Sequence, residues 1–363
     1  MLYDFEVYSF KISQKPLARI GVKVAATTGR DKGMSSTTQT DSTADRSTDS
    51  YGADSDLVDF ILGITFEIWE QGQVEKIHDY YAADCEVYSL EGMTEDAATM
   101  VSNTHATLAS FPDRLLIADD VITTGTAKKG FSSHRLISPM TNMGDTVFGP
   151  DSGQKVMAMN IADCEVNDGL ITREWLVRDN LAVVTQLGFN PLDCARTIAA
   201  RFDTRQIEWL ASEYTRTCND SGESGQDPTH SFARDVLEAC WLTGDTEVLE
   251  STYAPYCVMH RAPLRRFSGR DQVLEHYTQW RSAFPAASLS VDHVCSQPFD
   301  QDNQRIAVRW SVAGLHEGDF TNAPASGKPV YILGVTHWQL VNGRIANEKT
   351  VIDELSVLAQ TLD

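Results

Sequence analysis

The chain has 363 residues, 42% of them hydrophobic, which is enough for more than one core and predicts two domains. Its formal net charge of −21 repels phosphate backbones and anionic lipid, so nucleic acid is not expected as a partner. No run of about 18 apolar residues exists, so no membrane span is expected either. The seven cysteines are widely spaced and form no C-x-x-C pair, which favours reduced thiols in a cytoplasm over disulfides or a zinc site.

The first 55 residues are not expected to form a domain. Residues 34–56 consist mainly of Ser, Thr, Asp and Gly and have almost nothing to bury, so they cannot offset their ordering entropy. We therefore predict a disordered segment over 1–55, or translation that begins at Met34.

Ordered sequence begins near Asp56, with a helix to about Trp69, a break at Gly72, a short helix and a strand. The same order of residues returns in the second part of the chain. Trp69, Gly72, Tyr81 and Cys85 recur 172 residues later as Trp241, Gly244, Tyr253 and Cys257. Phe111-Pro112 recurs at an offset of 173, and a further series recurs at 174, namely Arg135, Gly144, Gly153, Gly169, Glu174 and Asp179. This ordered series indicates a tandem duplication.

Each copy begins with helices, has a helix that ends at Phe-Pro, and continues in strands that close with a hairpin. The Asn-Gly pair at 342–343 is a strong hairpin signal in the second copy. This order predicts an α+β fold with two tandem domains, each a curved, mostly antiparallel sheet with its helices on one face. We expect domains at 56–189 and 230–363, joined by a helix and linker over 190–229.

The stretch DGLITREWLVRDNLAVVTQLG (168–188) reads as a strand entered through an Asp-Gly turn. Because side chains alternate between the faces of a strand, Trp175, Val177 and Asp179 are expected to share one face. Burial beside Trp175 disfavours the charged carboxylate and is expected to raise the pKa of Asp179.

These motifs resemble the SnoaL-like polyketide cyclase family of the nuclear-transport-factor-2-like superfamily. The first copy is similar in SFPD (110–113) and in the closing stretch that ends in Q-L-G. The second copy is similar in RWSVAGLHEGDFTNAPASGKPV (309–330) and in VMHRAP (258–263). The second copy lacks Q-L-G, so neither copy carries the complete pattern.

The resemblance implies a cone-shaped sheet around a cavity for a small hydrophobic ligand, with Asp179 as general acid/base in the first copy and Asp353 in the second. Alternatively, Asp179 caps a strand end or pairs with Arg178 or Arg135. For Asp353, the alternative is an ion pair with Lys349.

Further candidates come from the same comparison of the copies. His316 and His337 are candidate proton carriers. Arg135 and Arg309 are candidates to hold a carboxylate or enolate. The other candidate substrate-binding residues are Trp175, Tyr88, His134, Asn142 and His260.

His, Asp and Glu never occur at compact ligand spacing, so we expect no metal and no cofactor. The sequence thus predicts a cofactor-independent acid/base enzyme, of cyclase, isomerase, dehydratase or hydrolase type, for a small hydrophobic carbonyl or epoxide compound. The alternative is a ligand-binding or assembly module that kept the fold and lost the chemistry. In either case the copies are expected to form an intrachain pseudo-dimer, with further self-association left open.

Overall fold

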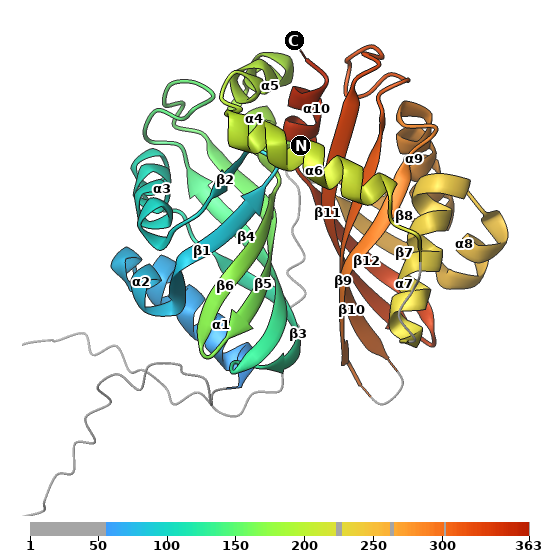
Figure 1. The fold of residues 1–363 in the computed structure, drawn as a ribbon, viewed down its shortest axis with the longest axis horizontal. Helices are drawn as coiled ribbons and strands as arrows, with labels where there is room; N and C mark the ends of the chain where they lie inside the picture. The colour runs from blue at the N-terminus through green and yellow to red at the C-terminus, as the bar shows by residue number, and fades with distance from the viewer. Residues whose placement is uncertain (1–55, 223–226, 262–264, 301–302, 363) are drawn as a thin grey trace, which may run out of the picture. The chain divides into compact units, whose positions relative to one another are not determined.

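Two six-stranded sheets follow one another along the chain (Figure 1). The computed structural model describes residues 56–222, 227–261, 265–300 and 303–362, and these belong to one compact unit. The expected disorder over 1–55 and the expected start at Met34 lie outside the described residues.

The N-terminal half, as we call residues 56–189, begins with helices and ends with one. Its helical elements are α1 (Leu57–Thr65), the π-helix η1 (Phe66–Glu70), the 3-10 helix η2 (Val74–Lys76), α2 (Ile77–Tyr80), α3 (Ala97–Ser110) and α4 (Asn180–Leu187). Its strands are β1 (Tyr81–Ser89), β2 (Gly92–Thr94), β3 (Ile117–Thr126), β4 (Lys129–Thr141), β5 (Lys155–Asn167) and β6 (Leu170–Arg178). They lie in the order β2-β1-β6-β5-β4-β3, and β1 and β6 are parallel while the other pairs are antiparallel.

The C-terminal half, residues 227–362, repeats this arrangement. Its helical elements are α7 (Pro228–Glu238), the π-helix η3 (Ala239–Thr243), α8 (Thr246–Thr252), α9 (Arg270–Ala283) and α10 (Glu354–Gln360). Its strands are β7 (Tyr253–Arg261), β8 (Arg265–Ser268), β9 (Ser288–Pro298), β10 (Gln304–Leu315), β11 (Pro329–Val341) and β12 (Arg344–Ile352). The order β8-β7-β12-β11-β10-β9 matches the first sheet strand for strand, which confirms the predicted α+β fold class.

Two elements differ from the expectation. The closing strand of each half stops at Arg178 or Ile352, and a helix follows, because Asp179 and Asp353 accept hydrogen bonds from the backbone of the next turn as N-caps. The segment between the halves forms two helices rather than one, α5 (Pro191–Ala199) and α6 (Thr204–Cys218). Here Asp203 caps the start of α6.

Both closing hairpins turn where the sequence indicates. Asn342 and Gly343 have φ angles of 51° and 72°, and Asp168 and Gly169 have 48° and 77°. Two successive residues in the left-handed region make the tight turn that suits twisted antiparallel strands, and Asn, Asp and Gly adopt it at the lowest cost.

Alternation gives each sheet two different faces. On β4, β5 and β6, the side chains of His134, Ala162 and Leu176 lie in one row and face the helices of their own half. The neighbouring positions face the other half: Asp163 accepts from Arg309 at 2.6 Å, and Ser133 Oγ lies 2.9 Å from His337 Nε2. Each half therefore has an interior face and an interface face.

None of the helices in the described part of the chain is long and apolar enough to cross a membrane.

Candidate functional site

The N-terminal half encloses a cavity of about 130 Å³ between its helices and the interior face of its sheet. Its apolar lining includes Ile64, Trp69, Leu136 and Leu176. A wider opening of about 730 Å³ adjoins it and shares several lining residues, namely Val87, Thr94, Asn103, Thr107, Arg114, Asn160 and Arg178. An apolar cavity with a few polar groups and an opening is the usual form of a small-ligand site.

Side-chain size explains why this interior is open. Leu136 pairs with Asn160 across β4 and β5, and the same positions in the C-terminal half hold Trp310 and Gly334. A Cβ atom on Gly334 would lie 2.3 Å from the Trp310 ring, so the indole fills the space that a side chain at this position would need.

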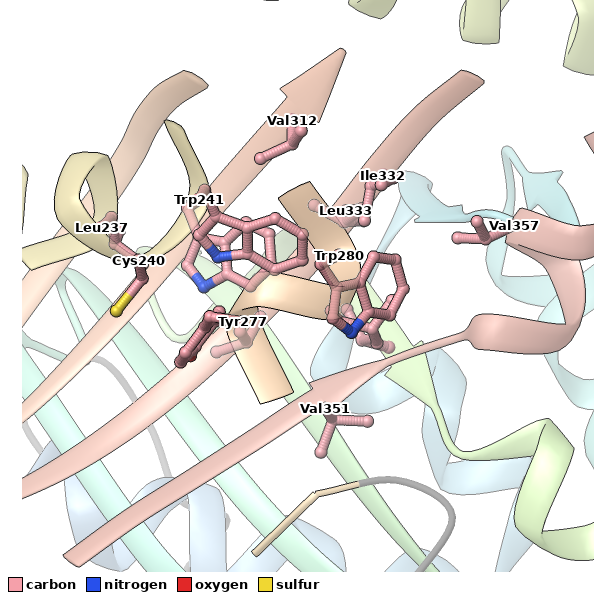
Figure 2. Close-up of a cluster of buried hydrophobic side chains, with 14 of the residues drawn as sticks. Leu237, Cys240, Trp241, Tyr277, Trp280, Val312, Ile332, Leu333, Val351 and Val357 are labelled. Atoms are coloured by element: carbon pink, nitrogen blue, oxygen red, sulfur yellow. The ribbon is translucent and has the colours of Figure 1, made fainter. Parts of the chain in front are cut away.

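The helix that faces the sheet shows the same contrast. The offset of 173 places Tyr277 and Trp280 of α9 where α3 has Thr104 and Thr107, which line the cavity. Figure 2 shows Tyr277 and Trp280 grouped with Trp241 in the interior of the C-terminal half. Large aromatic side chains thus occupy one interior, and threonines leave the other open.

Glu174 is the buried carboxyl group of the cavity. It is 5% exposed, the Tyr81 hydroxyl donates to it at 3.1 Å, and burial raises its pKa. Its counterpart Glu348 accepts from four donors, which are Tyr253, Tyr277, Trp338 and Thr350. The matching positions in the N-terminal half hold Tyr81, Thr104, Cys164 and Leu176. Glu174 has therefore kept only the tyrosine among these oxygen and nitrogen donors, and it faces a cavity instead of a packed core.

His134 and Asn160 supply further polar groups to the cavity wall. His134 is 3% exposed, and its Nε2 has no hydrogen-bond partner among the described residues. Burial, and after it the charges of His337 and Arg135, lowers the pKa of His134 to about 3. The ring is therefore neutral near pH 7 and free to bond a ligand.

Asp179 does not line this cavity or its opening, because β6 ends at Arg178 and Asp179 begins the turn into α4. Its Oδ1 accepts from the Ala182 backbone at 3.0 Å as the N-cap of α4, and its Oδ2 has no partner among the described residues. Burial raises its pKa as predicted, and the charges of Glu354 and Asp353 add to this. The alternative of an ion pair is wrong, since Arg178 pairs with Glu91 and Arg135 with Asp119.

Asp353 occupies the equivalent N-cap of α10. Ser356 donates to it, and Asn180 of the N-terminal half donates to its Oδ2 at 2.8 Å. Burial, helped by the charge of Glu91, raises the pKa of Asp353 to about 7. The expected partner Lys349 instead lies 2.9 Å from Asp119. Asp179 and Asp353 are thus gathered at the junction of the halves rather than in two interiors.

Most of the other predicted residues lie on the interface face. Arg309 stacks on the Trp175 ring at 3.4 Å, and Tyr88 stacks between Trp175 and Trp209. His260 pairs with Lys349 in the strand register, while its neighbours Met259 and Arg261 are fully buried. Burial and the charge of Lys349 lower the pKa of His260 to about 4.

His316 and Asn142 hold equivalent loops. His316 Nδ1 lies 3.1 Å from Ser326 Oγ, and Asn142 Oδ1 accepts from the Ser152 backbone at 2.8 Å. His316 packs beside Phe284. Of the predicted site residues, only His134 lines the cavity; Glu174, Tyr81 and Asn160 were not among the predictions.

Asp163, His293 and Cys295 meet at the interface and have the residue types of a metal site. His293 Nδ1 lies 3.4 Å from Asp163 Oδ2 and 3.7 Å from Cys295 Sγ. However, Arg309 donates to that same Asp163 oxygen at 2.6 Å. The guanidinium already neutralises the carboxylate, so the trio is explained as a buried polar cluster.

Comparison with known proteins places the family resemblance in the C-terminal half. Residues 231–361 match the model of the SnoaL-like polyketide cyclase family. No curated protein matches the chain. The half with the filled interior is therefore the one that the family model matches.

Three solved structures that match the chain each cover little more than a third of it. IdmH from Streptomyces antibioticus is 23% identical over 37% of this chain and 98% of its own, with a TM-score of 0.32. TsrD from Streptomyces laurentii is 19% identical over 38% and 98%, with a TM-score of 0.32. A SnoaL-like polyketide cyclase from Agrobacterium tumefaciens is 19% identical over 37% and 99%, with a TM-score of 0.32.

Proposed function

We propose that the cavity of the N-terminal half is the working site of a cofactor-independent acid/base enzyme. Its substrate is a small hydrophobic carbonyl or epoxide compound. The observation that supports this most strongly is Glu174, a buried carboxyl group with a raised pKa that has lost most of the hydrogen bonds of its counterpart Glu348. Glu174 thus takes the acid/base role that the sequence predicted for Asp179 and Asp353.

The chemistry follows from the positions of the groups. For a ketone, the Glu174 carboxylate removes a proton from the carbon next to the carbonyl, and the electron pair moves onto the carbonyl oxygen. Neutral His134 and Asn160 line the same cavity and are able to donate hydrogen bonds to that oxygen. The proton then returns to another carbon. Alternatively, the enolate carbon attacks a second carbonyl carbon, and the Glu174 carboxyl group gives its proton to the alkoxide oxygen that this forms. Burial suits Glu174 to this task because a pKa raised towards the working pH makes a carboxylate a better base.

Deuterium exchange tests the proton transfer without knowledge of the natural substrate. We would incubate the protein with 1-indanone, a two-ring ketone, in D₂O and follow deuterium uptake next to the carbonyl by NMR. Glu174→Gln is expected to lower the accelerated rate by at least about 10²-fold, as for loss of a general base. Glu348→Gln is the matched control, because it removes the equivalent carboxylate from the filled half and should leave exchange in place.

A non-catalytic binding module is the second candidate. It is favoured by the low pKa of His134, which makes that ring a weak base. Binding of 1-indanone with no acceleration of exchange over buffer would support this candidate and contradict the acid/base proposal.

We further propose that the halves are two copies of one family fold, joined as an intrachain pseudo-dimer. The strand orders support this, and so does an exchange of charged residues at the interface. The N-terminal half has Asp120 and Asp163 where the strand registers place His293 and His337 in the C-terminal half. His293 lies 3.4 Å from Asp163, and His337 lies 3.6 Å from Asp120. Two N-terminal halves paired in this way would place carboxylates opposite carboxylates. The interface therefore favours pairing of an N-terminal half with a C-terminal half.

Light scattering after gel filtration tests this arrangement. The mass of a single chain is expected, and a stable dimer would show that the internal pairing does not replace self-association. We also propose a cytoplasmic location, because all seven cysteines are free thiols.

A further inference from the structure

Arg114 is a cation that lines both the cavity and its opening. It lies in the loop between α3 and β3, directly after Phe111-Pro112-Asp113. Its side chain is half-buried, and the surface that it retains faces this hollow.

Among the residues that the structure describes, no anion balances this charge. Within the described residues, the side chain makes one hydrogen bond, from Nε to Ser138 Oγ at 3.3 Å, and no carboxylate lies within ion-pair distance. Arg178, the charged neighbour that acts on it, is itself a cation and is paired with Glu91. Glu91 also accepts from Asn180 at 2.9 Å, so both of its oxygens are engaged.

The fold does not require this arginine. The C-terminal half has Ala287 and Val312 at the positions of Arg114 and Ser138. A partly desolvated charge without a counterion destabilises a protein, and burial lowers the pKa of Arg114 to about 10. The Arg114 guanidinium remains charged near pH 7. Because it lowers the stability of the fold, we look for a function that it serves.

We propose that Arg114 binds a carboxylate of the ligand, so that the cavity takes a small molecule with an apolar body and one anionic end. This deepens the proposed function and rests on it. The planar guanidinium has two nitrogens left to donate, which suits the two oxygens of a carboxylate. The apolar body then lies against Leu136 and Leu176, and the carboxylate lies at the opening.

Two probes of equal size separate charge from shape. We would titrate the full chain with 2-naphthoate and with 2-naphthamide by calorimetry, and repeat this with Arg114→Met. Wild type should bind 2-naphthoate at least about tenfold more tightly than the amide, as expected for a charge-assisted hydrogen bond. Arg114→Met should bind both probes alike. Arg205→Met removes a cation from α6, outside the hollow, where Arg205 pairs with Glu95, and should keep the preference.

The possible failures are distinct. If the amide binds as tightly as the acid, or if Arg114→Met keeps the preference, the inference is wrong while the cavity remains a binding site. If neither probe binds, the inference and the proposed function both fail. Thermal unfolding serves as the folding control: Arg114→Met should unfold at a temperature no lower than wild type, because it removes an unpaired charge.

Discussion

A double substitution that copies the filled half into the open one should close the cavity. The pair Leu136→Trp and Asn160→Gly reproduces Trp310 and Gly334 on the equivalent strands. Both changes are needed, because the Trp310 ring occupies the place of the missing Cβ at position 334. Leu136→Trp alone should clash with Asn160 and cost about 1–3 kcal/mol, as overpacking does.

The cavity volume sets the size of the gain. At roughly 24 cal/mol per Å³, complete filling of about 130 Å³ is worth about 3 kcal/mol. Glycine in a strand subtracts roughly 0.5–1 kcal/mol, and one indole does not fill the space completely. The double variant should therefore be about 1–2 kcal/mol more stable than wild type.

Urea unfolding and calorimetry with 2-naphthamide measure both consequences. The double variant is expected to unfold at higher urea and to bind the amide too weakly to detect. Asn160→Gly alone is the control: it removes one hydrogen-bond donor but leaves the space open, so binding of the amide should be weaker than in wild type and still detectable. Undiminished binding in the stable double variant would refute the assignment of this cavity as the binding site.

The remaining predictions concern the junction of the halves. Burial raises the pKa of Asp353 to about 7, so its contribution to stability is full below the unfolded pKa near 4 and is lost as pH rises through 7. Between pH 5 and 8 this lowers the free energy of unfolding of wild type by about 2–3 kcal/mol. Asp353→Asn should remove this pH dependence. Urea unfolding at both pH values, with the exposed N-cap variant Asp245→Asn as control, checks this, and equal slopes in wild type and Asp353→Asn would contradict it. Asp163→Asn should lower the free energy of unfolding by about 3 kcal/mol, because Arg309 is left buried without its anion. The double variant with Arg309→Met should regain most of this free energy. The same loss in the single and double variants would show that the ion pair is not the cause.

Much of the fold was predictable because the sequence contains two copies of the same pattern. The offsets from Trp69 to Asp179 align the copies, and the Asp-Gly and Asn-Gly pairs locate both closing hairpins. The short helices α4 and α10 were missed because Leu181, Val183 and Val184 are also good strand residues. The N-cap at Asp179 favours a helix here, and the alternation of side chains along a strand gives no information about such a cap.

The site was harder to predict because alternation does not say which face is the interior. Trp175 and Asp179 have the apolar and acidic character expected of a cavity wall. Yet Trp175 stacks with Arg309 of the other half, and the charges of Asp353 and Glu354 in that half act on Asp179. Glu174 is conspicuous only when the copies are compared, since the partners of Glu348 become Thr104, Cys164 and Leu176. These differences between the copies can be found in the sequence. That the residues donate hydrogen bonds to Glu348 is known only from the structure.

One of the two related interiors is open to a small molecule, and the other is filled by its own aromatic side chains. A crystal structure of the protein grown with 2-naphthoate tests it most directly. We expect the ring system between α3 and the strands β4–β6, with its carboxylate against Arg114. Density for the ligand among Trp241, Trp280 and Trp310, or a ligand bound outside both halves, would contradict it.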